Sequence, residues 1–387
     1  MAESRPISSP GLQTSVFALV SAAFTTIYIT QPVLPLIQDN YQVSASRASI
    51  TISAVIFGIT LANLPFGTLA DRWRIRPIIL VGGSMVVVGN IICAFTKNFE
   101  GLVAARFLQG LFIPALTTCL AAFLSRQLPP ERLNVVMGTY VSATVAGGLA
   151  GRLLGGLFHP ALNWRWAFVV AAALITVACT AAWRWLPREH DRQQRPSAPL
   201  GFLQLLAQVP LLKNYLVAFS AFFVFSSVFN YLPFYLAGPL FKASTRTITL
   251  LYLAYLMGIL VGPLAGQLSN RFGNGRTMAA GACTFGISLG ATLYPSLPTV
   301  IIGLVGICAG FFTIHAAAAG WLNRNLVSSR GRANSLYVLF YYAGGSCGIT
   351  ISGMAYEAFS WPGVVCVGAV MMLVPLSIGL WRLKGQA

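Results

Sequence analysis

The chain has 387 residues, of which 56% are hydrophobic and only 9% are charged, and its mean hydropathy is +0.74. Soluble domains carry about 25% charged residues, so a soluble fold could not bury this much apolar surface, and the solvent must be lipid. The formal net charge of +17 does not indicate nucleic-acid binding, because the basic residues stand in short clusters between apolar stretches.

Apolar runs of about twenty residues recur along the chain, which is too long and too continuous for the alternating strands of a barrel. They predict twelve membrane-spanning helices. The first six cover 14–37, 48–70, 77–96, 101–124, 135–158 and 165–186. The second six cover 213–237, 246–268, 277–296, 299–322, 333–356 and 361–383. We therefore predict an all-α membrane protein with twelve transmembrane helices.

A charged, proline-containing segment, residues 187–212, separates the two sets of spans and is predicted to be a cytoplasmic linker. It divides the chain into an N-terminal half, residues 1–186, and a C-terminal half, residues 213–387. The halves resemble each other, because GTLADRWRIR after span two matches GQLSNRFGNGR after span eight, and GGLAG matches GGSCG. This internal repeat predicts two pseudo-symmetric six-helix halves with a substrate site between them.

The distribution of basic residues predicts the orientation in the membrane. With a cytoplasmic N-terminus, 18 of the 25 Lys and Arg residues fall on the cytoplasmic side and 5 on the other. This bias places both termini in the cytoplasm and the protein in the cell (inner) membrane as a multi-pass protein. The two remaining basic residues, Arg106 and Arg152, fall inside spans.

The loop after span two predicts a cytoplasmic gate formed by Gly67, Asp71, Arg72 and Arg76. Glycine permits close helix approach, and an aspartate at the membrane edge can pair with arginine or cap a helix N-terminus. The loop resembles the one between helices two and three of the major facilitator superfamily. The second copy has Asn270 in place of Asp71, so its ionic latch should be weaker or absent.

Glycines four residues apart form smooth stripes that favour close helix packing. They are Gly147, Gly151 and Gly155 in span five, Gly258, Gly262 and Gly266 in span eight, and Gly344 and Gly348 in span eleven. The span-five array resembles the antiporter signature of drug/proton exchangers in the superfamily, with Arg152 where the signature has a proline. The resemblance implies that span five packs on span eight and span two on span eleven.

Polar residues inside the spans are candidates to line a substrate cavity, with ordinary packing as the alternative. The candidates are Tyr28, Gln31, Arg106, Gln109, Arg152, Asn230, Tyr231, His315, Tyr337 and Tyr341. An arginine in mid-helix costs about 3 kcal/mol on insertion scales, so Arg106 and Arg152 need partners unless they reach outward to the membrane surface. Asp39, polar groups such as Gln31, and helix C-terminal carbonyls are the expected ones, and an anionic substrate would be a further partner.

His315 is the one histidine well inside the predicted bundle, which makes it a candidate for proton relay. Asp39, just after span one, is the second candidate for proton coupling. A hydrogen-bonded histidine that only packs is the alternative interpretation.

Nothing in the sequence indicates catalysis, because it lacks a nucleotide-binding glycine loop, an HExxH pair and a GxSxG turn. We expect no enzyme activity, no cofactor and no metal, and the seven scattered cysteines indicate packed thiols. The expected partners are a small-molecule substrate, protons or another ion, and the lipid bilayer, with the protein acting as a monomer.

The resemblance to the major facilitator superfamily covers nearly the whole chain and implies a secondary active transporter that works by alternating access. The span-five glycines favour proton-coupled efflux of a small organic compound. The lack of a carboxylate deep in the spans favours instead the uptake or exchange of an anionic metabolite. A non-transporting sensor or lipid-handling protein on the same fold is the alternative from another class.

Overall fold

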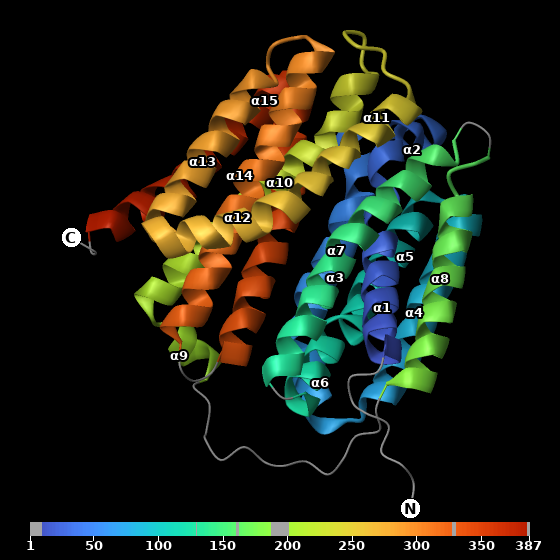
Figure 1. Cartoon of the computed structure of the whole chain (residues 1–387). Helices are drawn as coiled ribbons and strands as arrows, with labels where there is room; N and C mark the ends of the chain where they lie inside the picture. The colour runs from blue at the N-terminus through green and yellow to red at the C-terminus, as the bar shows by residue number, and fades with distance from the viewer. Residues whose placement is uncertain (1–9, 129, 160–161, 187–200, 327–329, 385–387) are drawn as a thin grey trace, which may run out of the picture. The chain divides into compact units, whose positions relative to one another are not determined.

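The structure is a computed structural model that describes residues 10–128, 130–159, 162–186, 201–326 and 330–384. The chain forms two compact units (Figure 1). Unit 1 comprises Met1–Thr30 and Ala54–Ser197, and unit 2 comprises Gln31–Ser53 and Ala198–Ala387. The segment Gln31–Ser53 therefore packs with unit 2, although it precedes most of unit 1 in the sequence.

Every regular element in the described residues is a helix. The helices from the first half of the sequence are α1 (Pro10–Tyr28), η1 (Gln31–Val33), α2 (Leu34–Tyr41), α3 (Ala45–Arg72), α4 (Ile75–Phe95), α5 (Phe99–Leu116), α6 (Thr118–Gln127), α7 (Pro130–Leu157) and α8 (Trp166–Trp185). Those from the second half are α9 (Phe202–Leu206), α10 (Val209–Ala237), α11 (Thr245–Leu251), η2 (Tyr252–Leu256), α12 (Met257–Phe272), α13 (Asn274–Ala291), α14 (Leu297–Asn325) and α15 (Arg330–Lys384).

All twelve predicted spans coincide with these helices, which confirms the predicted fold class. Spans one, four and eight are each divided into shorter helices, and α15 contains spans eleven and twelve, joined at Ser360 with a φ of 54°. Nine stretches of the described chain are long and apolar enough to cross a membrane, and one of them, Gly331–Arg382, holds the last two spans. The first part of the predicted linker, residues 187–200, lies outside the described residues.

The outer surface of both units is apolar, as expected for helices that contact lipid. Large side chains with more than 60% of their surface exposed include Val177, Ile287, Ile302 and Val370. Because water would penalise such a surface, these side chains identify lipid as the surrounding medium.

Glycines at equivalent places in the two units bring helix backbones together. In unit 1, α1 lies beside α7, and a Cβ added at Gly151 would overlap the carbonyl oxygen of Thr25. In unit 2, α10 lies beside α15, and a Cβ at Gly348 would overlap the carbonyl oxygen of Phe223. The two glycines are 197 residues apart and their partners 198, so the internal repeat extends to single contacts.

Spans one and seven differ where both carry a proline near a polar residue. In span one the α-helix ends at Tyr28 and a 3-10 turn contains Pro32, because proline cannot donate a hydrogen bond and its ring clashes with the preceding turn. In span seven, α10 continues through Pro233, and the hydroxyl of Tyr252 donates to the freed carbonyl of Phe229 at 2.9 Å. Tyr252 thus supplies the hydrogen bond that Pro233 cannot donate, and α10 continues without a break.

Candidate functional site

In unit 1, Arg106 of α5 is fully buried and binds the end of α1. One terminal nitrogen donates to the carbonyl of Thr26 at 2.7 Å and to Oε1 of Gln109 at 2.7 Å, and the other donates to the carbonyl of Ile27. These carbonyls belong to the last turn of α1, where the regular hydrogen bonding of the helix ends. Of the partners expected for this arginine, the structure therefore shows helix C-terminal carbonyls.

Arg152 of α7 is also fully buried and lies against the same part of α1. Its guanidinium carbon is 3.9 Å from the ring centroid of Tyr28, and one nitrogen donates to the carbonyl of Gly148 at 2.6 Å. The carbonyl of Gly148 and the face of the Tyr28 ring both stabilise the guanidinium charge, because each presents its negative side to the cation. Tyr28, Arg106, Gln109 and Arg152 thus form one cluster around the last turn of α1.

In unit 2, His315 of α14 and Tyr337 of α15 form a hydrogen-bonded pair. The tyrosine oxygen is 3.0 Å from Nδ1 of the histidine, and the Tyr337 side chain is 4% exposed. The ring of Tyr341, one turn further along α15, is 5.4 Å from the histidine ring. The structure therefore brings together three of the candidate residues from spans ten and eleven.

This pair lies at the edge of an extended aromatic cluster. Phe311 stacks parallel to the His315 ring at 6.0 Å and to Phe225 at 3.8 Å. Phe222 stacks on Tyr341 at 3.7 Å. Because aromatic rings surround His315, few groups can exchange a proton with it. Among the described residues, Tyr337 is the hydrogen-bonding neighbour that the structure shows.

Asn230 and Tyr231 of α10 differ in how their polar groups are satisfied. The Tyr231 hydroxyl donates to the carbonyl of Ile349 at 2.8 Å, which ties α10 to α15. Asn230 is fully buried, and both atoms of its amide lack a hydrogen-bond partner. Such an amide is costly to bury, so Asn230 is the candidate with unused hydrogen-bonding capacity.

The two remaining candidates of the first half belong to the segment that packs with unit 2. Gln31 is buried in η1, and Asp39 is exposed in α2. Arg106 and Arg152 belong to unit 1.

The glycine stripes have different surroundings in the two units. Gly147, Gly151 and Gly155 of α7 face the carbonyls of Ser21 and Thr25 in α1 and of Ile29 just after it, while packing of span five on span eight stays a prediction. Gly258 faces the ring of Phe312, but nothing lies within 4 Å of a Cβ at Gly262 or Gly266. Contact with a backbone carbonyl excludes any side chain, which explains why α7 carries three glycines in register.

The predicted gate residues fall at the end of α3 and the start of α4. A Cβ at Gly67 would meet nothing within 4 Å, and Arg72 is exposed, while the Asp71 side chain lies outside the described residues. Arg76 donates to the carbonyl of Leu186 at 2.5 Å, which ties α4 to the end of α8.

The repeat of this loop in unit 2 contains a neutral counterpart of the expected latch. Arg324 at the end of α14 donates to the side-chain oxygen of Asn270 and, at 3.5 Å, to that of Asn274. Amides accept these bonds without neutralising the charge, so this end of unit 2 keeps its positive charge.

Sequence reasoning missed Glu357, although it is the single acidic residue of the C-terminal half. Its Oε1 accepts the backbone N–H of Ser46 at 3.3 Å, at the first turn of α3. Both residues belong to unit 2. A carboxylate at a helix N-terminus is favourable, and this one holds the start of α3 on α15.

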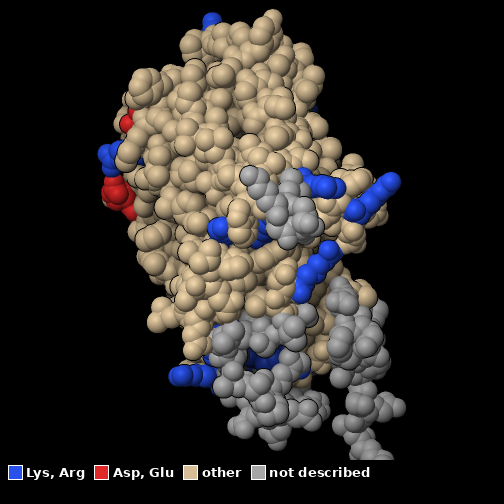
Figure 2. Space-filling view, turned by 90° about the vertical axis from the view of Figure 1, so that its left-hand side faces the viewer, with Lys and Arg blue, Asp and Glu red and all other residues tan. Residues whose placement is uncertain are grey.

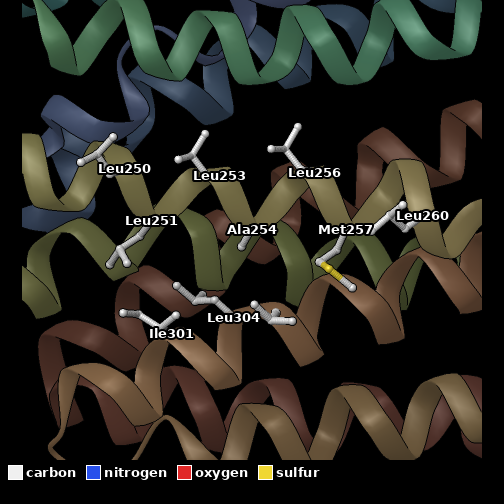
Figure 3. A pocket seen from close by; sticks show the side chains of 10 residues that line it. Leu250, Leu251, Leu253, Ala254, Leu256, Met257, Leu260, Ile301 and Leu304 are labelled. Atoms are coloured by element: carbon white, nitrogen blue, oxygen red, sulfur yellow. The ribbon is translucent and has the colours of Figure 1, made fainter.

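An apolar groove of about 300 Å³ lies between η2 with its flanking helices and α14. Figure 3 shows Leu251, Ala254 and Met257 on one side and Ile301 and Leu304 on the other, turned toward one another. Its lining carries no polar side chain, so it offers nothing that would orient a polar substrate.

Taken together, helices long and apolar enough to cross a membrane, in a chain with an internal repeat and with polar clusters inside each unit, are typical of a polytopic membrane transporter. The family model of the Major Facilitator Superfamily matches residues 16–311 and 240–385. The chain belongs to the major facilitator superfamily.

Similar proteins agree with this assignment. An uncharacterised MFS-type transporter of Bacillus subtilis strain 168, YybF, is 27% identical over 95% of this chain and 93% of its own length. The inner membrane transport protein YnfM of Escherichia coli strain K12 is 27% identical over 94% of this chain and 88% of its own. In structure, the human organic anion transporter MFSD10 (TETRAN) is similar with a TM-score of 0.75, at 16% identity, covering 96% of this chain and 100% of that one.

Proposed function

We propose that the protein exports a small organic compound across the inner membrane in exchange for protons, with both termini in the cytoplasm. The observation that carries this proposal is the His315–Tyr337 pair, a titratable group with a hydrogen-bonding partner inside a membrane-spanning segment. Histidine is the side chain whose ordinary protonation range lies nearest neutral pH, so it suits proton exchange. The glycine array of α7, which resembles the antiporter signature, supports the outward direction.

The proposed function is tested by flux in proteoliposomes with an imposed pH gradient and a panel of cationic, neutral and anionic compounds. Export requires accumulation that depends on the gradient and collapses when a protonophore removes it. Absence of any flux across the panel would favour the alternative of a sensor or lipid-handling protein.

His315→Gln is expected to flatten the pH dependence of flux while exchange of substrate across the membrane continues. The reason is that glutamine keeps a hydrogen-bonding side chain but cannot take up a proton in this range. The measurement is flux between pH 5.5 and 8.5, with Tyr337→Phe as the matched variant, since it keeps the histidine and removes its partner. An unchanged profile in His315→Gln would show that the histidine only packs.

A second candidate is transport of an anionic metabolite, favoured by the two buried guanidinium groups of unit 1. Arg152→Ala should then weaken binding of an anionic ligand by about tenfold, which corresponds to about 1.4 kcal/mol, and Arg152→Lys should weaken it less. Binding in detergent to matched anionic and cationic ligands tests this. Equal loss of both ligands, or of neither, would assign Arg152 a structural role.

A further inference from the structure

One end of unit 2 concentrates positive charge. We call it the basic end and define it as Lys213, Arg271, Arg276, Arg324 and Arg382. The two ranges of unit 2 contain two acidic residues, Asp39 and Glu357. Glu357 lies three residues before Ser360, where α15 is interrupted, and Arg382 lies 22 residues after it, or roughly 33 Å at 1.5 Å per residue, so Glu357 cannot neutralise this end.

The helix α13 begins within the basic end and adds to its charge. It starts at Asn274 after Gly273, has no side-chain cap and has no acidic residue in its first turn. Arg276, in that first turn, is exposed. A helix N-terminus carries about half a positive charge and favours acidic neighbours, so an arginine at this place is unfavourable unless an anion joins it.

Arg382 near the end of α15 supplies an independent observation. Its Cβ would lie 3.0 Å from a Cβ at Gly275, so the side chain starts against the first turn of α13. The residue is 7% exposed, one nitrogen donates to the side-chain oxygen of Asn214 at 3.1 Å, and the guanidinium lies 3.9 Å from the Trp321 ring centroid. Nε and Nη1 have no hydrogen-bond partner. The guanidinium charge of Arg382 therefore lies against a neutral amide and an aromatic ring, and two of its nitrogens donate no hydrogen bond.

The surface of α15 next to this cluster suits acyl chains. Val370, Leu373 and Trp381 are exposed by 65%, 59% and 51%, and Nζ of Lys213 lies 3.4 Å from the Trp381 ring centroid. Tryptophan and lysine at the end of an apolar helix are typical of the level of lipid headgroups. On the face shown in Figure 2, most of the Lys and Arg stand over the middle and lower part of the surface, with others at the top and at the left edge, and Asp and Glu show only along that left edge.

We propose that the basic end of unit 2 is a binding site for an acidic phospholipid. The phosphate diester of the headgroup binds at the N-terminus of α13, beside Arg276, Arg324 and Arg382, and the acyl chains lie along α15. The apolar surface that continues from the cluster favours a lipid over a free phosphate ion. This site does not depend on the direction of transport or on its coupling ion.

The test uses the full-length protein purified in a neutral detergent, with phosphatidylglycerol, phosphatidylcholine or inorganic phosphate added. We expect phosphatidylglycerol to raise the midpoint of thermal unfolding by about 4 °C, and the other two to leave it unchanged. Arg276→Gln and Arg382→Gln should each remove at least half of that rise. Arg276 is exposed, so its variant tests the site even where Arg382→Gln does not fold.

Arg246→Gln is the matched control, because Arg246 is an exposed arginine in the first turn of another helix of unit 2, α11. This variant should keep the full response to phosphatidylglycerol. An equal rise with phosphatidylcholine, an equal rise with inorganic phosphate, or an undiminished rise in Arg276→Gln would overturn the proposal.

Discussion

Gly151→Ala is expected to disrupt the packing of unit 1 and to abolish transport. A Cβ at Gly151 would overlap the carbonyl oxygen of Thr25, which is backbone and cannot rotate away. Gly147 and Gly155 hold the same two helices one turn to either side, so α1 cannot move at one point alone. Overpacking costs about 1–3 kcal/mol even where side chains can adjust, and we expect at least the upper value here.

Gly138→Ala on the same helix is the control, because nothing lies within 4 Å of its added Cβ. Alanine is the better helix former by about 1 kcal/mol, so this variant should be neutral or slightly stabilised. Thermal unfolding in detergent and flux in proteoliposomes measure both variants. If the two alanine variants behave alike, close approach of α7 to α1 is not what the glycine provides.

In unit 2, Gly303 is not a position that would tolerate a side chain. It is buried in α14, and a Cβ there would lie 2.7 Å from Cγ2 of Thr292 and 3.0 Å from the carbonyl of Ser288. Gly286, with nothing within 4 Å, is the suitable tolerant position in unit 2.

Arg106→Leu is expected to destabilise unit 1 by about 2–4 kcal/mol, because it removes the charged donors that bind the carbonyls of Thr26 and Ile27 at the end of α1. Arg106→Lys should recover part of this loss, since one ammonium cannot reproduce the planar arrangement of the guanidinium donors. The free energy or midpoint of unfolding in detergent is the measurement. Substrate affinity should fall only as far as folding does, if the arginine acts on α1 alone.

Arg184→Gln, at an exposed arginine near the end of α8, is the control and should stay within about 0.5 kcal/mol of the wild type. Wild-type stability in Arg106→Leu combined with a selective loss of anionic ligands would contradict the capping role. That result would support the second candidate function instead.

The sequence alone determined the fold class, because membrane spans follow from local composition. A run of about twenty apolar residues must form a helix in lipid, where each backbone group needs an internal partner. The internal repeat also follows from the sequence, and the structure repeats it at Gly151 with Thr25 and at Gly348 with Phe223. Such positions depend on residue type and spacing, which the sequence records directly.

Only the tertiary structure decided what each polar residue contacts. Arg106 binds the carbonyls of Thr26 and Ile27, some 80 residues away along the chain, and His315 meets Tyr337 across two helices. The glycines of α7 face α1, a neighbour that their spacing did not identify. Hydropathy and spacing indicate which face of a helix is smooth or polar, but the neighbour of that face is set by how the helices of one compact unit pack together. Contacts of this kind join distant segments, so no local pattern specifies them.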